Sequence, residues 1–238
     1  MNSNRGASGV ALLAVAAVVA LSGPAGAVPR KIQTNTAFAG FEVAKTKAHI
    51  HSASVRFVVP KITCRNNLSG VGPSVLIQSV GNPRTNAHSE SGGGVGVACE
   101  DKTPIYNAIV EVVSHSYDDI LHPLAAGDRV VVTVTYGPRR TVASVRDVTA
   151  RRSFTRSAGH SVGEYAFFGD SSVEIDALGI GLDPFTTTHF RGAKINGRWI
   201  VRQKPIRTNW VNSKGVVLVA ASKLSAHDTF TTTFKRSS

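Results

Sequence analysis

Three polar side chains interrupt stretches of sequence that otherwise look like apolar strands: Gln78, Glu111 and Glu164. Glu164 lies in the middle of the run 161–170. Because side chains of an extended chain alternate between faces, it would share a side with Ala166 and Phe168. A carboxylate among such neighbours costs free energy to desolvate unless a partner or a wet cleft stabilises it. We therefore interpret Glu164 as a candidate functional residue that needs a partner.

Gln78 is a chemically suitable partner for Glu164. A glutamine opposite a glutamate can hold one water molecule: the carboxylate removes its proton, and the amide N–H donates to the developing oxyanion. This pair would hydrolyse an amide without a metal, a cofactor or a covalent intermediate. The structural alternative is that these groups are hydrogen-bonded components of the core, which is the more common role of a buried glutamate.

Other familiar catalytic patterns have little support in the sequence. It has no D-T/S-G pair and no H-E-x-x-H motif, and its G-x-S-x-G run, residues 159–163, is not followed by the helical pattern of a nucleophile elbow. His49 and His51 have a spacing that some metal sites use, but no third ligand with matching spacing, and we interpret them as solvent-facing. The pair Asp118-Asp119 fits a capped turn better than a catalytic dyad. We expect neither a metal nor a cofactor.

The first 27 residues have the features of a secretory signal peptide. Arg5 provides a positive start, residues 10–21 are apolar but too short to span a bilayer, and Ala25-Gly26-Ala27 offers a cleavage site. No later run is long and apolar enough for a membrane helix. We expect a secreted product cleaved near Ala27, with a short extension over 28–36 and one domain over 37–236.

The chain is strongly basic, with a formal net charge of +12, or +11 once the signal peptide with Arg5 is removed. This charge favours acidic surfaces such as cell-envelope polymers, anionic lipid or nucleic acid. The basic residues are spread out and lack the interleaved aromatics of nucleic-acid modules. We expect a solvated basic surface, no specific nucleic-acid partner, acidic cell-envelope polymers as a candidate partner, and a monomer.

The two cysteines, Cys64 and Cys99, predict a disulfide. An isolated pair in an exported protein usually forms a bridge, and neither cysteine has the CxxC partner of a zinc site. Closing a loop of about 35 residues contributes roughly 3–4 kcal/mol, mostly through the unfolded state.

The chain from Phe38 onward reads as short strands separated by turns. Asn196-Gly197 is a type I′ hairpin signal, and the segment 212–215 joins two further strands. The polar, glycine-rich segment 81–96 reads as a flexible surface loop. Turns every eight to twelve residues without helical crossovers predict an all-β, antiparallel two-sheet sandwich in a single domain. The expected strands include residues 55–59, 74–80, 105–113, 129–136, 141–146, 153–156, 163–168, 173–176, 206–211, 216–220 and 229–235.

The order of several segments resembles the glutamic peptidases, also called eqolisins or peptidase family G1, particularly their bacterial secreted members. The likeness extends from about Phe38 to Lys235, and its order and spacing are more specific than any single motif. The stretches that carry it are Phe57–Cys64, Ile77–Val80, Ala98–Glu111, Gly163–Tyr165, and the C-terminal Phe190–Gly197 and Trp210–Phe234.

The resemblance implies a curved, lectin-like antiparallel β-sandwich and an endopeptidase that hydrolyses polypeptides in acid. By residue-by-residue transfer, Glu164 is the general base and Gln78 polarises the developing oxyanion. Glu111 matches a glutamate that lines the substrate cleft.

The chain also departs from the family pattern. No tryptophan lies between Cys64 and Gln78, and the aromatic stretch A-W-Y-E-x-Y-P is replaced by the aliphatic segment 108–114. The segment after Gln78 reads Ser79-Val80-Gly81 instead of T-G, and a second acidic residue, four places past the catalytic glutamate, is replaced by Phe168. These departures fit an endopeptidase of altered specificity. They also fit an inactive relative that acts as an extracellular or cell-envelope binding module.

Overall fold

The computed structural model describes residues 32–44, 49–65, 71–78, 89–159, 163–172 and 182–236. The expected signal peptide, the expected strand at 173–176 and residues 81–88 of the loop predicted at 81–96 lie outside the described residues. Within the described part, no helix is long and apolar enough to cross a bilayer.

The described chain consists almost entirely of strands, with one short 3₁₀ helix, η2 (Ile200–Gln203). The strands are β1 (Gln33–Asn35), β2 (Phe38–Ala44), β3 (Ser52–Val58), β4 (Val71–Gln78), β5 (Glu90–Glu100), β6 (Thr103–Val112), β7 (His115–Leu124), β8 (Arg129–Tyr136), β9 (Thr141–Asp147), β10 (Arg152–Ala158), β11 (Tyr165–Ser172), β12 (Thr188–Ile195), β13 (Arg198–Trp199), β14 (Ile206–Val211), β15 (Val217–Ala221) and β16 (Thr229–Phe234).

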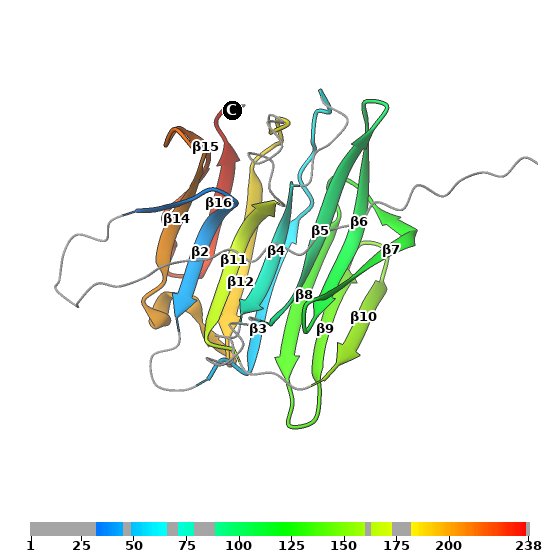
Figure 1. Cartoon of the computed structure of the whole chain (residues 1–238), viewed down its shortest axis with the longest axis vertical. Helices are drawn as coiled ribbons and strands as arrows, with labels where there is room; N and C mark the ends of the chain where they lie inside the picture. The colour runs from blue at the N-terminus through cyan, green and yellow to red at the C-terminus, as the bar shows by residue number, and fades with distance from the viewer. Residues whose placement is uncertain are drawn as a thin grey trace, which may run out of the picture.

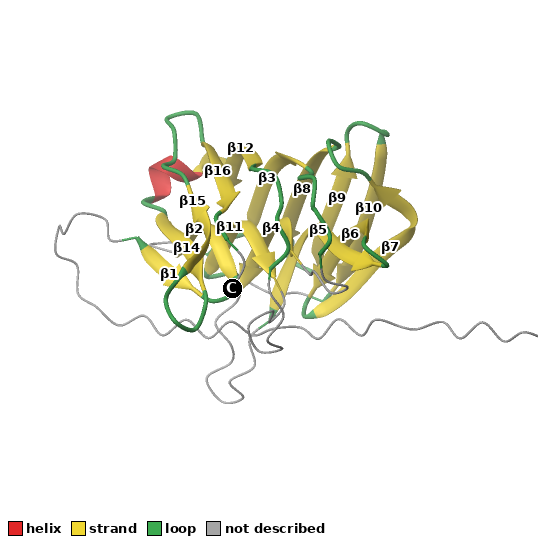
Figure 2. Cartoon of the chain, turned by 90° about the horizontal axis from the view of Figure 1, so that it is seen from above, coloured by secondary structure: helices red, strands yellow, loops and turns green. Residues whose placement is uncertain are grey.

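The strands form two stacked layers (Figures 1 and 2). The first sheet has the order β14-β2-β11-β4-β5-β6-β7, and the second has the order β10-β9-β8-β3-β12-β16. Strand β15 pairs with both β14 and β16 and so joins the two sheets along one side. Neighbouring strands in these two orders are all antiparallel. Strand β1 lies outside them and pairs with β14 in parallel. The prediction of an all-β antiparallel two-sheet sandwich is therefore confirmed.

The core lies between the two sheets and is built by period-2 alternation. Phe168 and Ala166 of β11 point into it and are fully buried, as are Val110 of β6 and Val132 of β8. Gly93 of β5 permits close approach of the layers, because a Cβ there would lie 2.9 Å from Cγ2 of Val145 in the second sheet. Apolar burial on this scale is the main favourable contribution to folding.

The predicted disulfide is present between Cys64 and Cys99, whose Cα atoms lie 5.7 Å apart. It ties the segment after β3 in the second sheet to the end of β5 in the first sheet. Cys99 is fully buried and belongs to the core. The bridge therefore links the two layers covalently.

Three local predictions from the sequence are confirmed. The Asn196-Gly197 turn joins β12 to β13, and both residues have the positive φ of a type I′ turn, 50° and 74°. The turn between β14 and β15 is closed by a hydrogen bond from Gly215 N–H to the Asn212 carbonyl and by Asn212 Oδ1, which accepts from Lys214 N–H. His49 and His51 are both exposed, as expected.

Two other predictions are wrong. Residues 90–96 are not a loop, because β5 begins at Glu90 and pairs with β4 and β6. Asp118 and Asp119 do not cap a turn but lie within β7, opposite Ile109 and Ala108 of β6. In both cases pairing with neighbouring strands stabilises a strand that local composition does not favour.

Asp170 is an ionisable group inside the core, and it predicts acid-favoured stability. It lies on β11, is fully buried, and accepts hydrogen bonds from the hydroxyls of Thr188 on β12 and Thr232 on β16. Burial raises the pKa of Asp170 to about 7, although the bonds from Thr232 and Thr188 oppose this. The unfolded pKa is about 3.9. Ionisation therefore opposes folding, and the free energy of unfolding should fall as pH rises from about 4 to about 7.

The variant Asp170→Asn tests this origin of the pH dependence. The asparagine side chain is neutral at every pH. A plot of the variant's free energy of unfolding against pH should therefore lack the contribution of Asp170 to its slope, which approaches 1.4 kcal/mol per pH unit for one proton. Urea unfolding curves measured between pH 4 and pH 8 provide the comparison. If the two proteins have the same slope, Asp170 is not the titrating group.

Candidate active site

The strand register brings Gln78 and Glu164 together although 86 positions separate them in the sequence. Gln78, the last residue of β4, pairs with Tyr165, the first residue of β11, and Glu164 directly precedes Tyr165. Gly163 forms an antiparallel bridge with Ile50, through Ile50 N–H to Gly163 O at 2.8 Å and the reverse bond at 3.2 Å. Glu164 is thus held between a bridge and a strand, beside the end of β4.

The sequence had predicted that Glu164 lies within a strand. In the structure it lies just before the strand. Strand β11 begins at Tyr165, and Glu164 occupies a bend in which it is half-buried. Alternation within β11 does set the neighbouring residues: Ala166 and Phe168 point into the core, and Phe167 belongs to the outer face. Strict alternation with Ala166 and Phe168 would place Glu164 on the inward face. Because Glu164 lies in a bend, this alternation does not apply to it.

Glu111 belongs to a row of paired residues that crosses the outer face of the first sheet. The register places it beside Gly92, and the row of Gln78 and Glu90 is the next one along the strands. Residues paired across strands share a face, so positions 78 and 111 lie on the same side of the sheet. The full row reads Glu42, Phe167, Leu76, Gly92, Glu111, Ser116.

The environment of Glu111 disfavours its charge. It is half-buried, and its Oε1 atom is inaccessible and has no hydrogen-bond partner among the described residues. Desolvation raises the pKa of the Glu111 carboxyl above its ordinary value. This carboxyl therefore becomes neutral at a higher pH than an exposed glutamate does.

Three glycines on the outer face of β5 contribute no side chains between these polar positions, although the Ile109 side chain lies against Gly96. Gly92, Gly94 and Gly96 alternate along the strand and so occupy the same face as Glu111. On the row that contains Glu111, no side chain stands between Leu76 and Glu111. The glycine-rich composition that suggested a loop instead clears one strand of the candidate site.

Glu42 on β2 is a further carboxylate of this face that the sequence interpretation missed. It is 3% exposed, its Oε1 has no hydrogen-bond partner among the described residues, and burial raises the pKa of the Glu42 carboxyl. It pairs with Phe167 and Ile206. The signal was available, because Glu42 interrupts the apolar strand Phe38–Ala44 in the same way that Glu164 interrupts its own run.

Glu42→Leu is expected to stabilise the protein at neutral pH. A buried carboxylate without a partner opposes folding once ionised, so its removal should raise the free energy of unfolding at pH 7 by about 1–3 kcal/mol. Since the carboxyl is largely neutral at pH 4, the gain there should be smaller. Thermal and urea unfolding at both pH values check this. A loss of stability at pH 7 would show that Glu42 has a stabilising partner.

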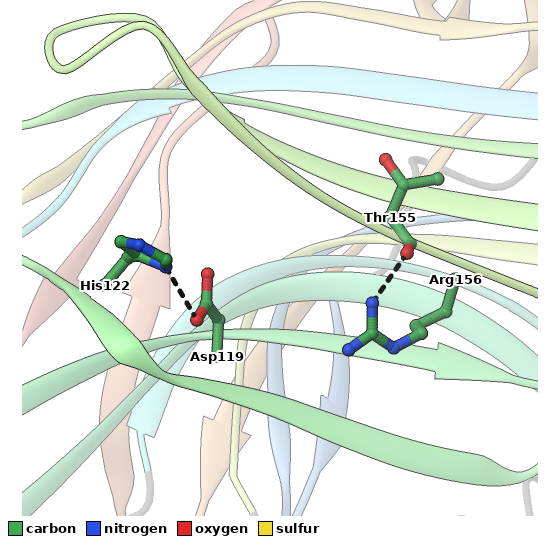
Figure 3. Close-up of polar contacts among 4 residues, drawn as sticks. All are labelled: Asp119, His122, Thr155 and Arg156. Atoms are coloured by element: carbon green, nitrogen blue, oxygen red, sulfur yellow. Dashed lines mark hydrogen bonds and ion pairs between the residues drawn. The ribbon is translucent and has the colours of Figure 1, made fainter.

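A separate polar cluster lies at the far edge of the sandwich (Figure 3). His122 Nδ1 lies 3.3 Å from Asp119 Oδ1 on β7, and Arg156 on β10 donates from Nη1 to the carbonyl of Thr155 at 3.0 Å. Asp119 and His122 help to line a small hollow between β6, β7, β9 and β10. Ser153 also lines this hollow, and its Oγ lies 3.3 Å from Ser144 Oγ. The strand order separates this cluster from Gln78 and Glu164.

Metal chemistry finds no support in the arrangement of ligand atoms. Within the described part of the chain, the group with suitable spacing consists of Cys64, Cys99 and Asp183. The two sulfurs are joined to each other, and Asp183 Oδ1 accepts the backbone N–H of Arg65 at 3.0 Å. These atoms are used by the fold.

Comparison with known proteins identifies the class of this sandwich. The family model of the peptidase A4 family matches residues 36–197. Scytalido-glutamic peptidase with a transition state analog inhibitor superposes with a TM-score of 0.66 at 15% identity, covering 84% of this chain and 98% of that one. SCP-B, a member of the eqolisin family bound to the tripeptide Ala-Ile-His, gives 0.62 at 14% identity, with the same coverage. Aspergilloglutamic peptidase from Aspergillus niger gives 0.52 at 18% identity and covers 70% of this chain and all of that one.

The chain thus has the β-sandwich fold of these glutamic peptidases. The chain belongs to the peptidase A4 family, as its resemblance to the eqolisins had predicted. A comparison with curated protein sequences gave no match.

Proposed function

We propose that this chain is a secreted, monomeric endopeptidase that cleaves polypeptides in acid by means of Glu164 and Gln78. The observation that carries the proposal is the register of β4 and β11, which places these two positions at adjacent strand ends. Family membership supports a polypeptide as the substrate. The Cys64–Cys99 disulfide supports an oxidising, extracellular location.

The proposed reaction needs one water molecule and no cofactor. The Glu164 carboxylate removes a proton from the water as its oxygen attacks the scissile carbonyl carbon. The side-chain amide of Gln78 donates a hydrogen bond to the developing oxyanion and stabilises it. When the tetrahedral intermediate collapses, the C–N bond breaks and the protonated Glu164 returns its proton to the leaving amine.

Acid action is supported by the carboxyls around the proposed site. Burial raises the pKa values of Glu42, Glu111 and Asp118, all on strands of the first sheet. Each of these carboxyls becomes neutral at a higher pH than an exposed carboxyl does, so weak acid reduces the negative charge of this sheet. The raised pKa of Asp170 acts in the same direction on the stability of the whole fold.

An inactive binding module is the second candidate, favoured by the aliphatic strand β6. Ile109 and Glu111 occupy the outer face of a segment in which the family carries aromatic residues. The departure at Phe168 carries less weight, because this side chain is fully buried between the sheets and does not contribute to the outer face.

Digestion of a denatured protein separates the two candidates. The mature chain, starting at Val28, is incubated with a denatured protein between pH 3 and pH 8, and fragments are identified by mass spectrometry. We expect cleavage that is fastest in acid and is unaffected by chelators and by inhibitors of serine and cysteine peptidases. Absence of cleavage at every pH would reject the endopeptidase and leave the binding module.

A further inference from the structure

The outer face of the second sheet carries one exposed arginine on each of four neighbouring strands. They are Arg191 on β12, Arg56 on β3, Arg129 on β8 and Arg146 on β9, and we call them the arginine band. Arg191 pairs directly with Arg56, and both Arg56 and Arg146 pair with Val131, two residues beyond Arg129. At about 4.8 Å per strand, the band extends roughly 14 Å across the sheet.

Among the residues that the structure describes, no carboxylate neutralises the arginine band. Strands β3, β8, β9, β10, β12 and β16 together contain one acidic residue, Asp147, which points inward, is 7% exposed and accepts the backbone N–H groups of Thr149 and Ala150. Among the described residues, none of the four guanidinium groups has an ion-pair partner. Like charges directly opposite each other, such as Arg56 and Arg191, destabilise a sheet. The band is therefore a row of available positive charge.

The surroundings of the band are mainly hydroxylated. The adjacent row reads Ser54, Thr133, Ser144, Thr155. Beyond Ser54 the row continues to Lys194 and Trp199, whose exposed ring lies under the Lys194 ammonium at 4.1 Å. The aromatic side chains of β3 and β8, Phe57 and Tyr136, point inward and are buried. One ring beside the band offers no platform for stacking successive bases, and without a large apolar patch the face offers little to insert into a lipid bilayer. A narrow line of cations beside hydroxyl donors matches a single linear polyanion.

We propose that the arginine band binds a linear phosphate-bearing polymer that lies across the strands. The planar guanidinium fork forms two parallel hydrogen bonds with phosphate oxygens, and serine and threonine hydroxyls donate to the oxygens that remain. The choice of phosphate over carboxylate rests on the proposed acid action, because phosphodiesters keep their charge in acid and carboxylates lose theirs. The band and the candidate active site lie on opposite faces of the sandwich, so a bound polymer leaves that site accessible.

Binding to long-chain inorganic polyphosphate tests the proposal. The variant Arg56→Gln/Arg129→Gln/Arg146→Gln/Arg191→Gln is compared with Lys61→Gln/Lys102→Gln/Lys214→Gln/Lys223→Gln, which removes the same charge from exposed positions elsewhere. Dissociation constants are measured for the full mature chain at pH 4 and several salt concentrations. Circular dichroism and thermal melting verify that both variants are folded.

The band variant should bind at least about tenfold more weakly and show a shallower salt dependence, while the control variant should lose about threefold or less. Equal losses in both variants, or an unchanged band variant, would overturn the proposal. Duplex DNA, anionic vesicles and polygalacturonate serve as alternative probes, and tighter binding to any of them than to polyphosphate would also overturn it. Glu164→Gln should bind polyphosphate as the wild type does, so this test can fail or succeed independently of the peptidase proposal.

Discussion

Glu164→Gln is expected to lower kcat/KM for a peptide substrate by about 10²- to 10⁴-fold, the usual contribution of a general base. The substitution keeps the size of the side chain and removes its ability to accept a proton. Since Glu164 lies in a bend outside the core, we expect the free energy of unfolding to change little. The loss should appear mainly in kcat, because the proton is transferred in the transition state.

Glu100→Gln is the matched control for this experiment. Glu100 is exposed at the other end of β5, far along the strand from the pairing of Glu90 with Gln78. The control should hydrolyse the substrate at the wild-type rate. Equal activity of Glu164→Gln and the wild type would exclude Glu164 as the base.

Removal of the disulfide is expected to have the largest effect on stability. In the chain-entropy model, a bridge across 35 residues stabilises the fold by about 4 kcal/mol. This is a large share of the roughly 5–15 kcal/mol that is typical of a folded domain. Because the bridge connects the two layers, its loss should also separate the end of β5 from the second sheet more easily.

The double variant Cys64→Ala/Cys99→Ala measures this effect. Alanine avoids placing an unpaired hydroxyl at the buried position 99. Urea unfolding should show a decrease of about 3–4 kcal/mol in the free energy of unfolding, and the wild type should lose a similar amount when reduced. A decrease below about 1 kcal/mol would show that the unfolded chain is already compact around this loop.

Local signals in the sequence predicted much of the fold. The Asn196-Gly197 turn adopts the positive φ values that only a few residue types tolerate, and alternation along β6, β8 and β9 identifies their buried faces. These features depend on neighbours within a few residues, which the sequence contains explicitly.

The parts that sequence did not predict depend on pairing between strands, which local composition does not show. The glycines of β5 have no side chains to show alternation, and β4 and β6 stabilise this strand from both sides. Asp118 and Asp119 are poor strand formers that nevertheless pair with β6. The adjacency of Gln78 and Glu164 follows from the β4–β11 register, and only the family resemblance could indicate it beforehand.

The candidate site was predicted as three residues, and the structure adds a fourth residue, the carboxylate Glu42. Glu42 lies on the row of Glu111 although 69 positions separate them, because β2, β11, β4, β5 and β6 are neighbours. A search for charged residues in apolar strands would have found it. Predicting that Glu42 lies on the outer face would also have required the order of the strands in the sheet.

The central claim is that Glu164 and Gln78 act on the same water molecule. A double-mutant cycle tests it most directly, with kcat/KM measured for the wild type, Gln78→Ala, Glu164→Gln and the double variant at the pH of maximal activity. Gln78→Ala alone should cost about 10²- to 10³-fold, as expected for loss of one oxyanion donor. If both residues serve one water, the double variant should be little worse than Glu164→Gln alone. Losses that multiply in full would show that the two residues act independently and would contradict the proposed dyad.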